Sequence, residues 1–327
     1  MTPPTATFRR GATRHGAKLT DVRSLTARFS SPNRAVIAAV LRDMSYEVLP
    51  FKNTEDAVLA HVPTDVRVTV TTTEAKGLEP TLVLAERLAR QGYRAAPHIA
   101  ARLVRDDGHL KDIVARLDDA GVYGVFVIGG DAADPAGSFT DAVTLLESLE
   151  TMGHHFKRIG IGGYPEGHGN ISSDVLQRAL QLKSAHATHI ITQLCFDAAA
   201  TTDWARQLVR DGVRLPIMVG MPGAVSRQKL IRISTSIGLG QSARFLQKQH
   251  SMFWRFFLPG GYSPDRLIEG LAPSFAADDN GLTGLHLFTF NAIQETEAWR
   301  QQALARLGPA ASEAPSSPPD HRTPPQT

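Results

Sequence analysis

Short apolar segments recur along this chain, and a polar residue lies in or at the end of nearly every one. Eight of them occupy residues 46–50, 66–72, 95–98, 125–131, 159–164, 190–193, 217–222 and 285–291. A stretch with helical periodicity follows almost every segment. Strands that alternate with helices predict a parallel sheet, and eight such units predict a closed (β/α)8 barrel. In that fold the active site lies at the carboxyl ends of the strands, so the polar residues there are the candidate site residues.

Composition divides the chain into three parts. Residues 1–30 form a basic arm that we expect to be flexible, and residues 308–327 form a tail rich in Pro, Ser and Ala that we expect to be disordered. Such segments bury too little apolar surface to fold by themselves. Residues 31–307 carry all the expected strands, and we predict that they form one barrel domain. Length alone would suggest about two domains, but barrels of about 250 residues are common single domains.

Several helices can be bounded from apolar spacing and from the glycines that follow it. We expect helices at 31–42, 79–91, 110–120, 139–152, from 173 onward, 202–212 and 226–237. A longer insertion, from 241 to about 275, precedes the last strand and contains Phe253, Trp254, Phe256 and Phe257. We expect this insertion to pack as an extra helical layer, and a lid over a ligand is the alternative.

Composition and charge exclude several classes of partner. The net charge is only +3, and much of it lies in the arm, so we expect no nucleic-acid binding. No apolar run approaches the roughly 18 residues of a membrane helix, and the N-terminus lacks the apolar core of a secretory signal. We therefore expect no membrane partner. The single cysteine, Cys195, rules out an intramolecular disulfide and fits a reducing compartment, so we expect a cytoplasmic protein.

Three of the apolar segments carry the ionisable candidates Glu47, His98 and Asp131. Glu47 stands between Tyr46 and Val48, where a carboxylate must be paired or must face a cavity. Desolvation would raise its pKa and suit it to act as a general acid near neutral pH. An ion pair at the barrel floor is the alternative. His98 and Asp131 end two other segments, and each of them is equally compatible with a structural role.

A further amide and one loop complete the polar candidates. Gln193 lies within an apolar strand, where its amide must find hydrogen bonds or face a cavity. The segment 162–168 joins a strand to a helix and carries Tyr164, Glu166 and His168. The histidines of the chain are scattered and lack zinc-ligand spacing, so we expect no metal site. No glycine-rich dinucleotide fingerprint or phosphate loop follows the first strand.

Taken together, these segments resemble the methylenetetrahydrofolate reductase family in order and spacing over roughly residues 45–300. The segments that carry the resemblance are 46–50, 68–71, 95–98, 129–131, 163–168, 191–197 and 286–291. The resemblance implies a barrel enzyme of one-carbon metabolism. In this family NAD(P)H reduces FAD, and the flavin passes a hydride to 5,10-methylenetetrahydrofolate to give 5-methyltetrahydrofolate.

The resemblance also implies roles for individual residues. Glu47 would be the general acid that protonates the leaving nitrogen of the folate ring. Asp131 and Gln193 would bind the pterin, since a carboxylate accepts from its N–H groups and an amide can both donate and accept. Asn291 would belong to the same substrate site. The positions that would contact the flavin or the nicotinamide are Thr71, Thr72, His98, Gly130, Asp131, Tyr164, His168 and Lys183.

The chain departs from the family pattern at several flavin positions. Gly129 stands where the family has an arginine, Gly169 and Asn170 replace a Pro-Glu pair, and Lys183 aligns only approximately. Ala292 stands where an arginine is common. We therefore expect FAD, if it binds, to bind weakly. Direct hydride transfer from NAD(P)H to folate is one alternative, and a folate-binding barrel that transfers a methyl group without a nicotinamide donor is another.

Overall fold

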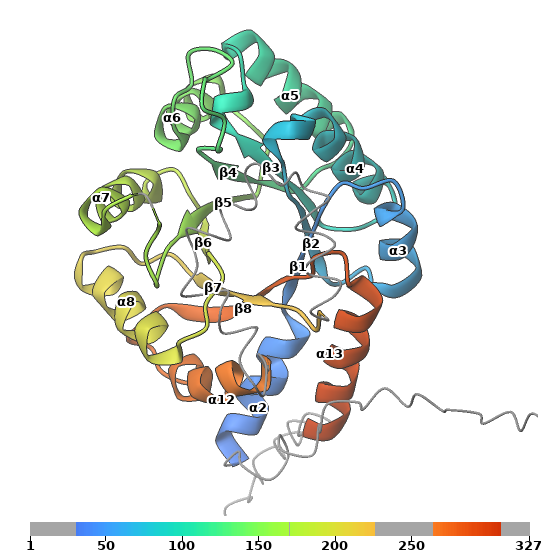
Figure 1. Ribbon diagram of the computed structural model, residues 1–327, viewed down its shortest axis with the longest axis vertical. Helices are drawn as coiled ribbons and strands as arrows, with labels where there is room; N and C mark the ends of the chain where they lie inside the picture. Colours follow the sequence, from blue (N-terminus) through green and yellow to red (C-terminus); the bar gives the residue numbers. More distant parts are fainter. Residues whose placement is uncertain (1–30, 170, 226–263, 309–327) are drawn as a thin grey trace, which may run out of the picture.

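A computed structural model describes residues 31–169, 171–225 and 264–308 as a barrel of parallel strands surrounded by helices (Figure 1). Each strand pairs with the next in sequence order, and β8 closes the ring on β1. The strands are β1 (Ser45–Val48), β2 (Arg67–Val70), β3 (Ala95–Ala100), β4 (Gly124–Ile128), β5 (Arg158–Gly163), β6 (His189–Thr192), β7 (Ile217–Pro222) and β8 (Leu282–Phe288). The predicted (β/α)8 barrel is confirmed.

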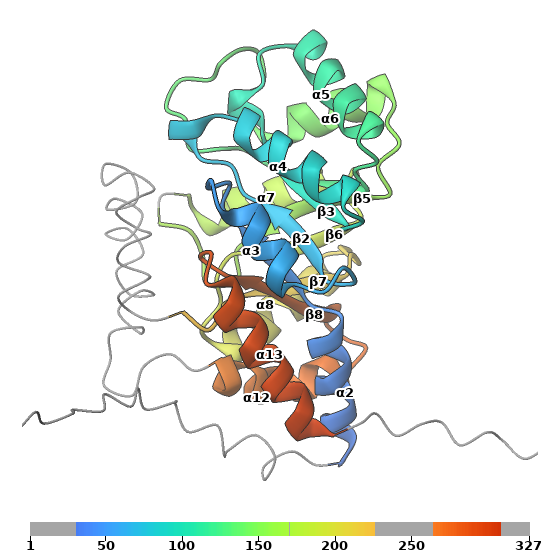
Figure 2. The same cartoon turned by 90° about the vertical axis from the view of Figure 1, so that its right-hand side faces the viewer.

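Helices cover the outside of the barrel. They are α2 (Ser31–Arg42), α3 (Thr54–His61), α4 (Glu79–Arg90), α5 (Asp107–Asp119), α6 (Ala142–Met152), α7 (Ser173–Ser184), α8 (Ala198–Arg210), α12 (Pro264–Phe275) and α13 (Ile293–Leu307), with short 3-10 turns η1 (Glu74–Lys76) and η2 (Ala101–Leu103). The helices α2 and α13 lie side by side (Figure 2). The Arg34 guanidinium on α2 donates to the carbonyls of Arg306 and Leu307, at 3.2 and 3.0 Å. Within the described ranges, no helix is long and apolar enough to cross a membrane.

Most predicted boundaries agree with the structure to within a few residues, and the differences have local causes. Helix α8 begins at Ala198 and not near residue 202, because the Asp197 carboxylate caps it by accepting from two N–H groups of its first turn. His98 lies inside β3 and not at its end, and Gln193 lies one residue beyond β6. The helices α3 and α13 were not predicted.

The insertion before the last strand is described only in its final part. The predicted helix at 226–237 and the four aromatic residues at 253–257 lie outside the described residues, as does the choice between an extra layer and a lid. The described part is α12, which packs against α8 and α2. The division of the chain at residues 30 and 307 stays a prediction.

The barrel has two apolar regions separated by its strands. The larger one lies between the strands and the surrounding helices. The smaller one lies inside the barrel and consists of Phe126, Ile191 and Met218, with Ile128 packed against them. Glycine makes room for it, since a Cβ at Gly160 would lie 2.6 Å from Cδ2 of Phe126. The rest of the interior includes polar groups, and these define the candidate site.

Candidate active site

Glu47 lies on the inner face of the barrel, one residue before the end of β1. The strand register pairs it with Thr69 on β2 and with Phe288, the last residue of β8. The Thr289 hydroxyl and N–H both donate to the Glu47 backbone carbonyl, at 2.6 and 3.2 Å. The side chain is only 15% exposed. Glu47 therefore lies in the carboxyl-end half of the barrel, where barrel enzymes have their active sites, and not at the floor.

Two imidazoles flank the Glu47 carboxyl group. Nε2 of His98 lies 3.6 Å from Oε2 of Glu47, and Nε2 of His286 lies 3.8 Å from the same oxygen. Both distances are too long for a hydrogen bond. Both Nε2 atoms are buried and have no hydrogen-bond partner among the described residues. Nδ1 of His286 is 2.7 Å from the Ser45 hydroxyl, and the His98 ring packs against Phe126 with 4.6 Å between the ring centres.

The protonation states of this cluster follow from burial. Desolvation raises the pKa of Glu47, and the nearby His98 lowers it by less. Desolvation lowers the pKa of His98 to about 4 and that of His286 to about 3. Both rings are then neutral at physiological pH, so these contacts are not ion pairs. A buried carboxyl group with a raised pKa can hold a proton near neutral pH and release it to a substrate.

The candidate threonines lie where β2 ends. The Thr71 N–H donates to the carbonyl of Val48 at 2.9 Å. The Thr72 hydroxyl lies within hydrogen-bond reach of the His98 carbonyl, at 2.8 Å, and of the Thr81 hydroxyl, at 3.0 Å. Both threonines therefore tie the end of β2 to its neighbours, close to Glu47 and His98.

The segments after β4 and β5 bring four more candidates together. Gly130 has a φ of +90°, and a Cβ there would lie 3.0 Å from the Cβ of Ala100, so this position favours glycine. Asp131 follows it and is exposed. Burial, and then the charge of Asp131, raise the pKa of Tyr164. The Tyr164 ring meets His168 edge to face, with 5.4 Å between the ring centres.

The loops after β5 and β6 are fastened to each other. One carboxylate oxygen of Glu166 accepts from the N–H groups of Phe196 and Asp197, at 2.5 and 2.8 Å. The Gln193 N–H donates to the carbonyl of Gly163 at 2.7 Å, and its side-chain oxygen accepts from the Leu194 N–H at 2.9 Å. Gln193 therefore stands at the mouth of the barrel beside the loop that carries Tyr164. The sequence had singled out Glu166 without predicting this bracing role.

Asn291 holds the segment that follows β1. Its side-chain NH2 donates to the Leu49 carbonyl at 3.0 Å and to the Thr54 hydroxyl at 2.8 Å. Its side-chain oxygen accepts from the Leu49 N–H at 2.8 Å. The backbone φ of +52° is one that asparagine tolerates better than most residues. The structure thus gives Asn291 an anchoring role, and a substrate contact there stays a prediction.

The cations near the ends of β4 and β5 are turned toward the backbone. Lys183 donates to the carbonyl of Gly162 at 3.2 Å, and burial lowers its pKa to about 8. The Arg102 guanidinium donates to the carbonyls of Ala132, Ala133 and Thr140, at 2.6, 2.6 and 3.1 Å. A Cβ at Gly129 would meet no atom within 4 Å, so the space that a longer side chain would need is open. Among the described residues, these two cations are already bonded to backbone carbonyls, which leaves them poorly placed for charge-assisted hydrogen bonds to a flavin pyrophosphate.

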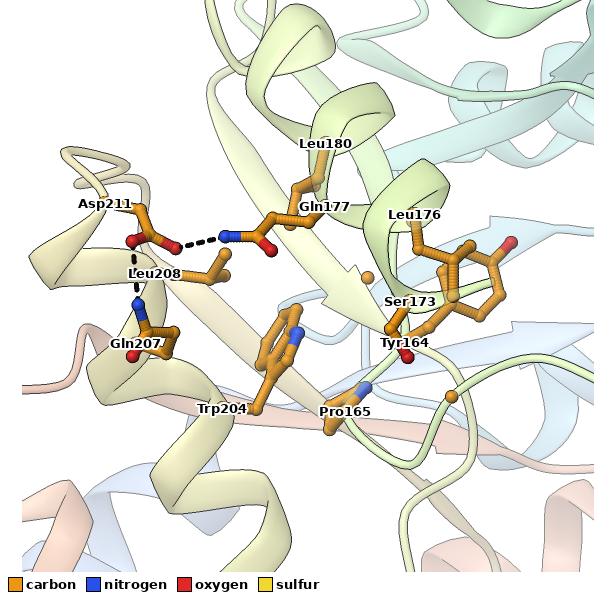
Figure 3. A pocket seen from close by; sticks show the side chains of 13 residues that line it. Tyr164, Pro165, Ser173, Leu176, Gln177, Leu180, Trp204, Gln207, Leu208 and Asp211 are labelled. Carbon is orange, nitrogen blue, oxygen red and sulfur yellow. Dashed lines mark hydrogen bonds between the residues drawn. The ribbon is translucent and has the colours of Figure 1, made fainter. Parts of the chain in front are cut away.

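A separate cleft of about 160 Å³ lies on the outside of the barrel, between α7, α8 and the loop after β5 (Figure 3). Trp204 and three leucines form much of its wall. Its Asp211 carboxylate accepts from the side-chain amides of Gln177 and Gln207, at 2.6 and 2.7 Å. Glu47, His98 and His286 do not line it. The Asp211, Gln177 and Gln207 side chains are hydrogen-bonded to one another. We therefore do not place the active site in this cleft.

A comparison with known families agrees with this geometry. The sequence model of the family described as methylenetetrahydrofolate reductase matches residues 49–246. The chain belongs to the methylenetetrahydrofolate reductase family. Membership supports a reductase-like, oxidoreductase function on the family's (β/α)8 barrel, and members of this family generally bind FAD. The matched span includes Asp131 and Gln193. Glu47 lies two residues before it, so the assignment of Glu47 depends on its motif and on its place in the barrel.

Proposed function

We propose that the protein reduces 5,10-methylenetetrahydrofolate with NAD(P)H and that Glu47 is its general acid. The observation that carries the proposal is the buried Glu47 carboxyl group, which lies at the carboxyl end of the barrel between two neutral imidazoles. The family's reaction needs a proton donor at this end of the barrel. The raised pKa of Glu47 suits that task at neutral pH.

The proposed reaction consumes one hydride and one proton. The bond between the methylene carbon and one nitrogen of the folate ring breaks, and its electron pair goes to that nitrogen. Glu47 delivers a proton there. A hydride from the nicotinamide forms the new C–H bond at the carbon, which becomes the methyl group. The products are 5-methyltetrahydrofolate and NAD(P)⁺, and Glu47 regains its proton from solvent.

Asp131 and Gln193 are the proposed pterin-binding residues. They follow β4 and β6, which lie across the barrel from β1. Both residues therefore reach the mouth of the barrel from the side opposite Glu47. An exposed carboxylate can accept from two adjacent N–H groups of the pterin, and an amide can bind an amide-like ring edge. Such contacts would orient the folate with its reacting carbon toward the interior, where Glu47 lies.

We further propose that the hydride passes directly from NAD(P)H to the folate. The support is the poor fit between the described residues and a flavin pyrophosphate, since Arg102 and Lys183 donate to backbone carbonyls. A colourless purified protein that oxidises NAD(P)H with methylenetetrahydrofolate, without added FAD, is the expected result. A yellow protein that retains stoichiometric FAD through dialysis would contradict this part of the proposal.

A folate-dependent NAD(P)H oxidation assay tests the function as a whole. The competing function, methyl transfer from a folate to a corrinoid or another acceptor, needs no nicotinamide. Oxidation of NAD(P)H that depends on methylenetetrahydrofolate, with formation of 5-methyltetrahydrofolate, is expected. Methyl transfer without any NAD(P)H oxidation would favour the competing function.

A further inference from the structure

Ser45, His286 and Glu47 form a line of polar side chains inside the barrel. The register pairs Ser45 on β1 with His286 on β8. Two residues further toward the mouth of the barrel, it pairs Glu47 with Phe288. Paired residues on neighbouring strands face the same side of the sheet. The His286 ring therefore lies between Ser45, 2.7 Å from its Nδ1, and the Glu47 carboxyl oxygen, 3.8 Å from its Nε2.

The hydrogen bond to Ser45 decides which ring nitrogen of His286 carries the hydrogen. The Ser45 hydroxyl lies 2.7 Å from Nδ1 and 3.9 Å from the sulfur of Met218. The hydroxyl can donate to Nδ1, or it can donate to the sulfur and accept from an Nδ1–H. A thioether is a weak acceptor, so we take the first arrangement. Nδ1 is then the acceptor of a neutral imidazole, and Nε2 is the N–H group. This N–H faces Oε2 of Glu47.

We propose that His286 is a positioning residue for the general acid, held by Ser45 so that its Nε2–H faces Glu47 Oε2 and supports the carboxylate that forms when Glu47 releases its proton. The inference rests on the proposed function for its catalytic meaning. Its structural content, the coupling of His286 to Glu47, stands independently. His286 is distinct from the residues that the family resemblance assigns, and it is not placed against the substrate.

The charges around His286 keep it a neutral donor. The titratable and charged groups around it are Glu47 on β1, His98 on β3, Arg67 on β2 and His189 on β6. Burial and the positive charge of Arg67 both oppose protonation of the His286 ring. Glu47 is therefore the group of this line that gains and loses a proton, with a pKa that burial raises, while His286 supplies a fixed hydrogen.

The test compares His286→Leu with His286→Gln. Leucine removes the N–H, whereas the glutamine amide can place an N–H near the position of Nε2. In His286→Leu we expect the pKa of the Glu47 carboxyl group to rise by about one unit. The titration is followed by ¹³C NMR, and the Glu47→Gln variant assigns the signal. We also expect the alkaline limb of the pH–rate profile of folate reduction to move to higher pH. In the same variant, kcat should fall about tenfold with little change in KM. His286→Gln should restore most of the Glu47 titration, of the pH profile and of kcat.

Two further variants keep the proposal testable if His286→Leu folds poorly. Ser45→Ala should shift the Glu47 titration in the same direction by a smaller amount, and it should have little effect in the His286→Gln background. His189→Gln is the matched control, because it alters a buried barrel histidine that is not paired with Glu47. An unchanged Glu47 titration in His286→Leu and Ser45→Ala overturns the inference. The NMR titration needs no turnover, so it still tests the coupling if folate reduction itself fails.

Discussion

Replacing Asn291 by alanine should loosen the segment after β1 and lower the free energy of unfolding. The side chain makes three hydrogen bonds, to the Leu49 carbonyl, the Leu49 N–H and the Thr54 hydroxyl. At about 1 kcal/mol net for each, their loss costs about 3 kcal/mol. The φ of +52° adds about 1 kcal/mol, because alanine tolerates the left-handed region less well than asparagine. We therefore expect Asn291→Ala to lose about 3–4 kcal/mol, measured by urea unfolding.

Asn291→Gly separates the two contributions. It loses the same hydrogen bonds but accepts the left-handed backbone, so it should be about 1 kcal/mol more stable than Asn291→Ala. Leu49 is two residues from Glu47, and we expect the loosened segment to reduce folate turnover as well. If both variants keep the wild-type free energy of unfolding and lose only folate affinity, the anchoring argument is refuted, and Asn291 is the substrate contact that the family resemblance implies.

Two other perturbations test the site by independent routes. Asp131→Ala should weaken folate binding by about 1–3 kcal/mol, because it leaves pterin donors unpaired, and calorimetric titration that gives wild-type affinity would remove Asp131 from the pterin site. Acid should destabilise the fold through three buried histidines whose folded pKa values are about 4, 3 and 3, namely His98, His189 and His286. Their unfolded pKa is higher, so the stability they contribute is present above pH ~6.5 and is lost as the pH falls, by up to about 1.4 kcal/mol per pH unit for each. Urea unfolding between pH ~6.5 and ~4.5 should show a shallower pH dependence in His189→Gln, and an unchanged slope would contradict the assignment of neutral buried rings.

The fold could be predicted because each strand–helix unit carries its own local signal. The predicted helix at 31–42 and the predicted strand at 217–222 match α2 and β7 residue for residue. Errors arose where a single side chain sets a boundary, as Asp197 does for α8. His98 was placed at a strand end because the length of β3 depends on its pairing with β4, which local sequence does not contain.

The candidate site was predictable as a set of residues but not as an arrangement. The apolar neighbours of Glu47 indicated burial, yet its level in the barrel is fixed by pairing with β2 and β8. The contact between Ser45 and His286 joins positions 241 residues apart, so spacing could not reveal it. The anchoring bonds of Asn291 likewise reach across 242 residues to Leu49.

Glu47→Gln should leave the fold intact. Glutamine keeps the shape of the side chain and cannot ionise. Because burial raises the folded pKa of Glu47, the stability tied to its protonated form is present at low pH and is lost as the pH rises through that pKa. Glu47→Gln should therefore be at least as stable as the wild type at alkaline pH. Glu55→Gln, at a half-buried position on α3 outside the barrel where Glu55 pairs with Arg87 at 3.1 Å, is the control for loss of a carboxylate.

The most direct test of the central claim is the rate of folate reduction by Glu47→Gln under saturating NAD(P)H and methylenetetrahydrofolate. A lost general acid costs about 100-fold or more, so we expect a fall of that size with folate affinity largely retained, and wild-type turnover in Glu55→Gln. Turnover by Glu47→Gln within a few-fold of the wild type would contradict the account, because the proton would then reach the folate nitrogen without this carboxyl group.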